Sequence, residues 1–126
     1  MPYKNLLLID DDEDDHEIFR CALQDVSVDI NFHTLGSARE ALQKLTANEI
    51  GTDVIFLDMN MPVMNGVQFL QEIKKVGQLC NIPIIVFSTS SNERTIKEAM
   101  DAGADNFITK PDKFNELVNI LRTIIL

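Results

Sequence analysis

A run of acids follows a short aliphatic segment near the N-terminus. Residues 7–16 read LLIDDDEDDH, so six consecutive acids, Asp10 to Asp15, come directly after apolar residues. Carboxylates this close together repel one another and raise each other's pKa unless a cation lies among them. The run therefore predicts either side chains that spread into solvent or a group of carboxylates that binds a metal ion.

Three other residues that could do chemistry each end a further aliphatic run. Asp58 follows VIFL, Ser88 ends IIVFS and Lys110 follows NFIT. In an open α/β sheet, ligands bind at the carboxyl ends of the strands, where the strand order reverses. If these runs are parallel strands, then Asp10, Asp11 and Asp58 converge at one crevice. A hydroxyl and an ammonium group join them there from Ser88 and Lys110.

Three clustered carboxylates form a hard, oxygen-only site. Such a site suits Mg²⁺, which binds one or two carboxylates together with waters and a phosphate. The ion would offset the repulsion, while Lys110 and Ser88 each hold a phosphoryl oxygen. Asp58 then remains as a nucleophile that can form an aspartyl phosphate. The expected chemistry is phosphoryl transfer, in which positioning and charge neutralisation supply most of the catalysis.

The elements that must position these residues alternate along the chain. Apolar runs typical of strands occupy residues 5–9, 29–33, 54–57, 84–88 and 106–109, and helical patterns of apolar residues lie between them. This alternation predicts an α/β fold, a (βα)5 doubly wound parallel sheet with helices on both faces. The flavodoxin-like strand order 2-1-3-4-5 is the common choice for five strands, and its order reverses between the first and third strands.

Boundary signals support this division of the chain. Ser37 and Ser90 are each followed three residues later by Glu, which is the pattern of a capping box at the start of a helix. Gly66 is placed to begin the third helix, and Gly103 is placed to end the fourth.

The composition restricts the partners and the setting. A length of 126 residues suits one domain, 1–126, with no output domain after it. A net charge of −9 argues against nucleic acid and anionic membranes as direct partners. No apolar stretch approaches the length of a membrane span. Cys21 and Cys80 form no metal or disulfide motif, which predicts reduced thiols in a cytoplasmic protein.

The chain resembles the receiver domain of bacterial two-component response regulators, of the single-domain, chemotaxis-regulator-like kind. The resemblance covers the chain nearly end to end, in the expected order and spacing. The matching stretches are LLLIDDD at 6–12, VIFLDMNMPVMNG at 54–66, IPIIVFSTS at 82–90 and AGADNFITKP at 102–111.

The resemblance implies a role for each residue of the metal site. Asp58 would be the phosphoacceptor and also a ligand of Mg²⁺. Asp11 would bind the ion directly, and Asp10 would bind it directly or through water. The backbone carbonyl of Asn60 would complete the protein ligands.

The resemblance also implies a switch beside that site. Ser88 would be the switch hydroxyl, Phe107 the aromatic side chain that turns inward with it, and Lys110 the contact to the phosphoryl group. The peptide bond between Lys110 and Pro111 would be cis. Thr89 departs from the small residue that is usual after the hydroxyl, and its bulk would narrow access to the phosphoryl group.

The function implied is a phosphorylation-activated signalling switch rather than a turnover enzyme. The domain would accept a phosphoryl group from a phosphohistidine of a sensor histidine kinase or histidine phosphotransfer protein, and would catalyse only its own phosphorylation and slow autodephosphorylation. Phosphorylation would change the face made by helix 4, strand 5 and helix 5, which a downstream protein reads. Ile120 and Ile124 widen the apolar face of the last helix, either as a broad buried stripe or as an exposed strip that contacts a partner or forms a homodimer.

Other functions fit the residues less well. A phosphatase of the haloacid dehalogenase type needs a second acid where this chain has Asn60, which cannot be a general acid. A flavin carrier needs a phosphate loop after the first strand, and six acids would repel the phosphate. A calcium loop fails because Asp15 and Cys21 replace its Gly and Glu. A receiver used only for binding remains open. The acids at 12–15 are interpreted as the solvated start of a helix.

Overall fold

Five strands and five helices alternate along the described part of the chain, as predicted. The computed structural model describes residues 3–26, 29–90 and 92–125. The strands are β1 (Asn5–Ile9), β2 (Asn31–Leu35), β3 (Val54–Leu57), β4 (Ile84–Ser88) and β5 (Asn106–Thr109). The helices are α1 (Glu13–Val26), α2 (Ala38–Thr46), α3 (Gly66–Ile73), α4 (Glu93–Asp101) and α5 (Phe114–Ile125).

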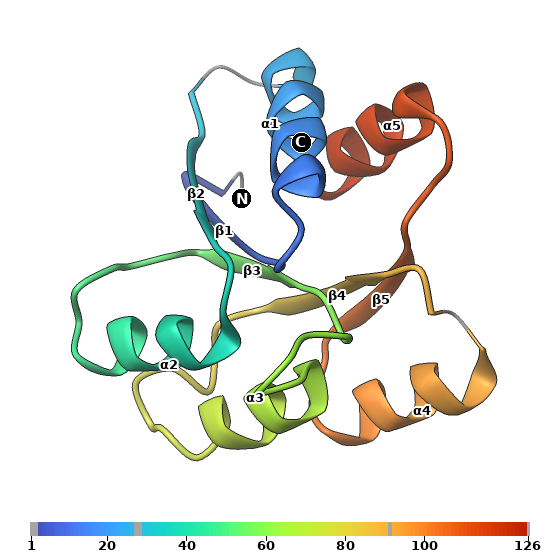
Figure 1. Ribbon diagram of the computed structural model, residues 1–126. Helices are drawn as coiled ribbons and strands as arrows, with labels where there is room; N and C mark the ends of the chain where they lie inside the picture. The colour runs from blue at the N-terminus through green and yellow to red at the C-terminus, as the bar shows by residue number, and fades with distance from the viewer. Residues whose placement is uncertain (1–2, 27–28, 91, 126) are drawn as a thin grey trace.

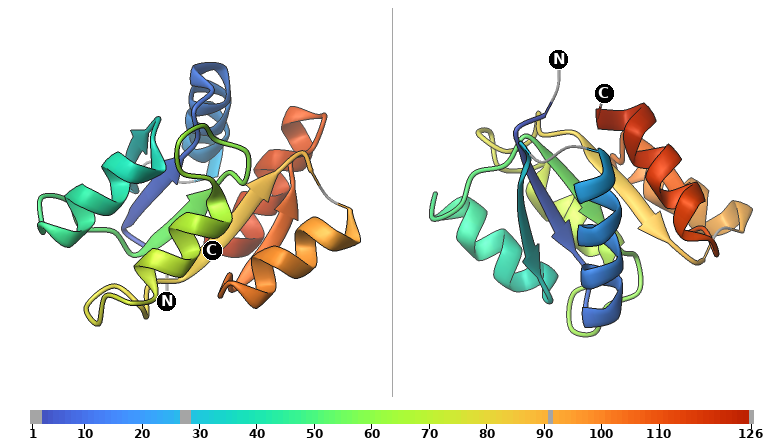
Figure 2. Two further views of the ribbon diagram at one scale, coloured as in Figure 1. Left: turned by 60° about the horizontal axis from the view of Figure 1, so that its bottom comes forward. Right: turned by 90° about the horizontal axis from the view of Figure 1, so that it is seen from above.

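The strands form one parallel sheet in the order β2-β1-β3-β4-β5. Helices α1 and α5 cover one face of the sheet, and α2, α3 and α4 cover the other (Figures 1 and 2). The predicted doubly wound α/β fold is therefore confirmed, and the strand order reverses between β1 and β3. Within the described ranges, no helix has the length and apolar character needed to cross a membrane.

The sheet separates two hydrophobic clusters. Because side chains alternate along a strand, Leu6 and Leu8 of β1 pack in the cluster with α1 and α5, whereas Leu7 and Ile9 pack in the cluster with α2, α3 and α4. All four side chains are almost fully buried. Burial on both faces explains why β1 has an uninterrupted apolar sequence.

Phe19 of α1 is the centre of the cluster under α1 and α5. Its ring packs edge-on against Phe56 and Phe87, with centroids 5.1 and 5.7 Å away, and stacks on Phe32 at 5.4 Å. These contacts fix α1 against strands β2, β3 and β4. The acidic start of the same helix is thereby held near the carboxyl ends of the strands.

The predicted bounds of β2 were wrong by two residues at each end. The sequence pattern indicated residues 29–33, but the strand runs from Asn31 to Leu35, in register with Asn5 to Ile9 of β1. β2 is an edge strand in which none of the residues is fully buried. Its polar residues, such as His33, interrupt the apolar signal on which the prediction depended.

The helix boundaries were predicted with mixed success. Ser37 caps α2, and its side chain accepts a hydrogen bond from the third helical residue at 3.2 Å. Gly103 ends α4 with φ of +113°, a left-handed conformation that favours glycine. The cap at Ser90 was wrong. Helix α4 is capped instead by Asn92, which accepts a hydrogen bond from Thr95 N at 2.8 Å.

Hydrogen bonds fix the C-terminal end of the loop between β3 and α3. Helix α3 begins at Gly66, as predicted, and Gly66 N donates to Met59 O at 3.0 Å. A reciprocal capping box joins Asn65 and Gln68, with both hydrogen bonds at 2.9 Å. These contacts fix the backbone that follows the end of β3.

Candidate functional site

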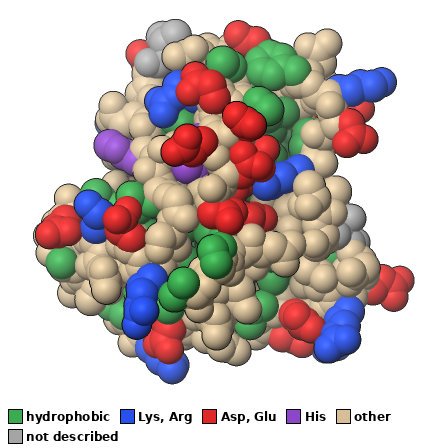
Figure 3. Space-filling view, in the orientation of Figure 1, with side chains coloured by type: hydrophobic (Ala, Val, Ile, Leu, Met, Phe, Trp, Pro, Cys, Tyr) green, Lys and Arg blue, Asp and Glu red, His purple; other side chains and the backbone are tan. Residues whose placement is uncertain are grey.

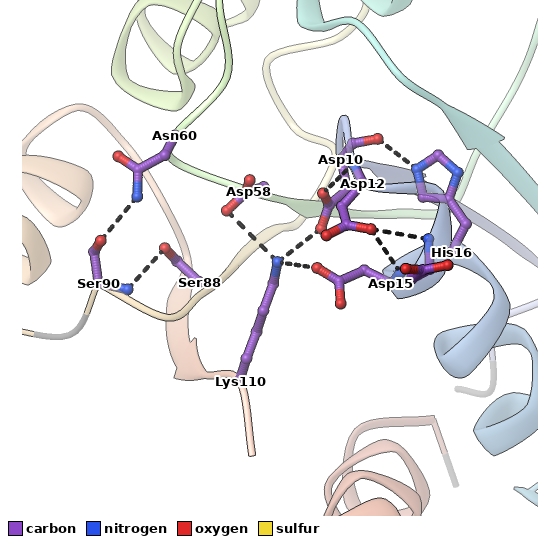
Figure 4. A network of polar contacts seen from close by, with 10 residues as sticks. Asp10, Asp12, Asp15, His16, Asp58, Asn60, Ser88, Ser90 and Lys110 are labelled. Carbon is purple, nitrogen blue, oxygen red and sulfur yellow. Dashed lines mark hydrogen bonds and ion pairs between the residues drawn. The ribbon is translucent and has the colours of Figure 1, made fainter. Parts of the chain in front are cut away.

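The polar residues that end four strands meet at one edge of the sheet, as the sequence predicted. Asp10 follows β1, Asp58 follows β3, Ser88 ends β4 and Lys110 follows β5 (Figure 4). Backbone hydrogen bonds extend the sheet to these residues. Asp58 N donates to Ile9 O, and Lys110 N donates to Ser88 O, both at 2.9 Å. The side chains are therefore positioned by the sheet itself.

Three carboxylates form the cluster that the sequence predicted. Asp10, Asp11 and Asp58 each offer a carboxylate oxygen, and these oxygens lie within 4.8 Å of one another. Asp10 and Asp58 are buried, and Asp11 is exposed. Acidic side chains gather around the beginning of α1 in the space-filling view (Figure 3). An all-oxygen donor set that is open to water on one side fits a hard divalent cation such as Mg²⁺.

Lys110 neutralises part of this charge. Its Nζ atom lies 2.8 Å from Asp10 Oδ2, 2.7 Å from Asp15 Oδ2 and 3.8 Å from Asp58 Oδ1. Burial alone would lower the pKa of Lys110, but the hydrogen bonds to Asp10 and Asp15 outweigh it and raise that pKa. The ammonium group is therefore charged at any physiological pH.

Asp58 is an unusual carboxylate. Burial raises its pKa to about 6, because the charge of Lys110 and the backbone N–H groups of Asn60 and Met59 only partly oppose the effect of burial, and the neighbouring Asp10 adds to the rise. Without a cation in the site, ionisation of the Asp58 carboxylate therefore lowers the stability of the folded protein. Ligation of a metal requires the carboxylate form, so metal binding and proton release at Asp58 are coupled.

Replacing Asp58 with asparagine should stabilise the metal-free protein at neutral pH. With a folded-state pKa of about 6 against 3.8, the folded protein binds more protons than the unfolded chain between these values, so this carboxylate weakens folding as the pH rises through them. At pH values above both pKa values, the ionised Asp58 destabilises the folded protein by the full amount. We expect Asp58→Asn to raise the free energy of unfolding at pH 7.5 by about 1–3 kcal/mol.

Urea unfolding in EDTA at pH 7.5 and at pH 4.5 measures this effect. The gain should shrink at the lower pH, where Asp58 of the wild type is protonated. Asp14→Asn, which removes an exposed acid of α1, controls for the change in net charge. An Asp58→Asn variant less stable than the wild type at pH 7.5 would contradict the electrostatic argument.

Ser88 and Phe107, the residues predicted to form a switch, lie on the neighbouring strands β4 and β5. Ser88 is fully buried, and its Oγ accepts a hydrogen bond from Ser90 N at 3.2 Å. Asn60 Nδ2 donates to Ser90 Oγ at 2.8 Å, so the loops after β3 and β4 are joined across the rim of the site. Phe107 is half-buried and packs against the cluster under α2, α3 and α4. The metal-ligand role of the Asn60 carbonyl and the switch role of Phe107 stay predictions.

Two expectations for this region were wrong. The peptide bond between Lys110 and Pro111 is trans, since no described peptide bond is cis. The trans isomer is the more stable one for most such bonds. Asp15 was interpreted as part of a solvated helix start, yet its carboxylate pairs with Lys110. Asp12 does serve the helix start, because its Oδ1 accepts hydrogen bonds from the backbone N–H groups of Asp14 and Asp15.

The chain is similar in sequence to known proteins over most of its length. The model of the response regulator receiver domain matches residues 6–122. Chemotaxis protein CheY of Thermotoga maritima is 32% identical over 124 residues, which is 96% of this chain and 97% of that protein. Transcriptional regulatory protein KdpE of Staphylococcus aureus is 37% identical over 113 residues, 89% of this chain and 47% of that protein. The chain spans about half the length of several relatives that it matches.

Solved structures agree with these sequence matches. The phosphorylated cyanobacterial phytochrome response regulator RcpA has a TM-score of 0.87 at 32% identity, over 97% of this chain and 91% of that chain. The Mn²⁺-bound form of response regulator Rcp1 has a TM-score of 0.82 at 27% identity, over 96% of this chain and 91% of that chain.

Proposed function

Because this chain belongs to the response regulator receiver domain family, whose members signal through phosphorylation, we propose that it is switched by a phosphoryl group carried on Asp58. The observation that carries the proposal is the convergence of Asp10, Asp11 and Asp58 within 4.8 Å, with Lys110 Nζ 3.8 Å from Asp58. The phosphodonor is a phosphohistidine of a sensor histidine kinase or of a histidine phosphotransfer protein. The two free cysteines suit a reducing compartment, and we propose that the protein is cytoplasmic.

The proposed cofactor is Mg²⁺, held by Asp10, Asp11, Asp58 and the carbonyl of Asn60. When bound, the ion supplies charge neutralisation for the carboxylates and for the phosphoryl oxygens. It also favours the ionised form of Asp58, which is the nucleophilic form.

Asp58, Lys110 and Ser88 have different roles in the phosphoryl transfer. A carboxylate oxygen of Asp58 attacks phosphorus, the new P–O bond forms as the P–N bond to the donor histidine breaks, and the imidazole takes up a proton as it leaves. The ammonium of Lys110 and the hydroxyl of Ser88 each hold a phosphoryl oxygen where negative charge accumulates. Hydrolysis of the aspartyl phosphate later resets the domain, so the protein acts on itself and not on a metabolite.

The readout is proposed to pass through the last two strands of the sheet. Ser88 of β4 pairs in register with Thr109 of β5, and Phe107 of the same strand pairs with Val86. A hydroxyl drawn toward the phosphoryl group would let the half-buried Phe107 move inward. This shifts the α4–β5–α5 face between two states of an existing equilibrium. A downstream protein then recognises the shifted face.

A homodimer through α5 stays a prediction. Ile120 and Ile124 are both half-buried, and Ile124 packs against the cluster under α1 and α5. Their burial favours the interpretation as a broad core stripe.

Intact-mass measurement after incubation with acetyl phosphate and Mg²⁺ tests the proposed function. We expect one added phosphoryl group in the wild type, none when EDTA replaces Mg²⁺ and none in Asp58→Asn. Absence of an adduct in both the wild type and Thr89→Ala, under conditions where Mg²⁺ binds, would contradict the proposal. Thr89→Ala resolves the remaining alternative, because a variant that gains the adduct would identify the exposed Thr89 side chain as a barrier to small donors.

A further inference from the structure

Lys110 has its shortest ion pair with a residue outside the carboxylate cluster. Lys110 Nζ lies 2.7 Å from Asp15 Oδ2 in the first turn of α1, but 3.8 Å from Asp58 Oδ1. Asp15 and Asp58 lie on opposite sides of the ammonium group (Figure 4). In this conformation Lys110 is held closer to the helix than to the proposed phosphoacceptor.

The ammonium group of Lys110 has few hydrogen-bond donors to share among its neighbours. Lys110 Nζ has three N–H donors, and two of them are taken by Asp10 at 2.8 Å and Asp15 at 2.7 Å. The distance of 3.8 Å to Asp58 is longer than a hydrogen bond. With both of these bonds in place, Lys110 has one N–H left for a phosphoryl group on Asp58, and a closer approach to that group requires the pair with Asp15 to open.

Asp15 differs from the other two carboxylate neighbours of Lys110. Asp10 and Asp58 belong to the cluster that fits a metal ion, so their charge is shared with a cation when one binds. Asp15 is not part of that cluster, and its attraction for Lys110 therefore persists in the metal-bound protein. The side chain of Asp15 is 32% exposed and that of Lys110 is 12% exposed, so water can replace either partner when the pair opens.

We propose that Asp15 is a positioning residue that holds Lys110 away from Asp58 and thereby slows phosphorylation. The inference rests on the proposed function, because it concerns the rate at which the same site accepts a phosphoryl group. Asp15 acts through Lys110 alone: it need not touch the donor, the metal or the phosphoryl group. Removal of its charge leaves Lys110 free to follow the developing charge on the phosphoryl oxygens.

The initial rate of phosphorylation in Asp15→Asn tests the proposal. With acetyl phosphate and saturating Mg²⁺, and with the adduct followed by intact mass, we expect the rate to rise about three- to tenfold, as for the loss of a partly exposed ion pair. Asp14→Asn is the matched control, because it makes the same chemical change in the same helical turn and Asp14 is exposed. It should change the rate by less than about twofold, since it removes only long-range repulsion of the anionic donor.

A double-mutant cycle identifies Lys110 as the residue through which Asp15 acts. In a Lys110→Met background, Asp15→Asn should accelerate phosphorylation no more than Asp14→Asn does. An increase that persists in that background would overturn the proposal, as would an Asp15→Asn rate equal to or below that of Asp14→Asn in the otherwise wild-type protein.

A structural measurement separates failure of this inference from failure of the proposed function. In a crystal structure of unphosphorylated Asp15→Asn, Lys110 Nζ should lie nearer to Asp58 Oδ1 than the 3.8 Å of the wild type. This distance can be measured whether or not the protein accepts a phosphoryl group. An unchanged position of the ammonium would refute the holding role of Asp15.

Discussion

Replacing Lys110 with methionine should lower the rate of Asp58 phosphorylation by about a hundredfold or more, because it removes a preorganised cation from the place where negative charge accumulates. Methionine keeps much of the length and apolar volume of the lysine stem, so packing beside Phe87 is largely preserved. The affinity for Mg²⁺ should be retained or increased, since the variant lacks the ammonium group that competes with Mg²⁺ for Asp10 and Asp58. The variant is thus expected to bind Mg²⁺ at least as tightly as the wild type while its phosphorylation is slower.

Phosphorylation by acetyl phosphate at saturating Mg²⁺ gives the rate, and a Mg²⁺ titration by calorimetry gives the affinity. Lys113→Met is the matched control, because Lys113 is exposed and forms no ion pair within the described residues. Both variants change the net charge equally. Equal rates in Lys110→Met and Lys113→Met would show that Lys110 is not part of the transfer machinery.

Replacing Gly66 with alanine should destabilise the protein by about 3 kcal/mol, the upper end of what overpacking usually costs. A Cβ atom at Gly66 would lie 2.8 Å from Met59 Sδ, 2.9 Å from Asp58 O and 2.9 Å from Met59 Cα. Two of these atoms belong to the backbone and cannot rotate away. The backbone at the end of β3 must therefore shift, and the Asp58 carboxylate moves with it, so phosphorylation should slow as well.

Gly77→Ala is the control for this experiment. A Cβ atom there would meet no atom within 4 Å, and the φ angle is not in the left-handed region. Urea unfolding should therefore show Gly77→Ala to be neutral or slightly more stable, by up to about 1 kcal/mol, because alanine restricts the unfolded chain. Similar midpoints for the two variants would mean that the loop after β3 adjusts freely.

The bounds of four strands could be predicted from the sequence, including those of the edge strand β5, in which no residue is fully buried. For β3 and β4, Val54–Leu57 and Ile84–Ser88 are buried throughout, which gives these strands a clear apolar signal. In β2, polar residues interrupt the apolar pattern, and the predicted bounds of this strand were wrong. The residues of the carboxylate cluster could be predicted because each follows the end of a strand with a clear apolar signal.

Asp15 could not be predicted in the same way. It lies in the first helical turn, where the helix dipole is sufficient reason for an acid, and its partner Lys110 is 95 residues away in the sequence. Only the packing of α1 on the sheet brings the two charges together. The helix cap at Asn92 was missed for a related reason: Ser90 and Asn92 are both good caps, and the competing contact of Ser90 with Asn60 is a tertiary one.

The sheet divides the hydrophobic core into two clusters, and this division affects how the sequence can change during evolution. Successive residues of β1 belong to different hydrophobic clusters, so Leu6 and Leu7 share almost no packing partners. Substitutions without shared partners have nearly additive effects on stability. A lineage can therefore remodel the surface formed by α4 while the packing beneath α1 and α5 stays unchanged. Such independence lets the surface on one face of the sheet evolve without loss of the packing on the other face.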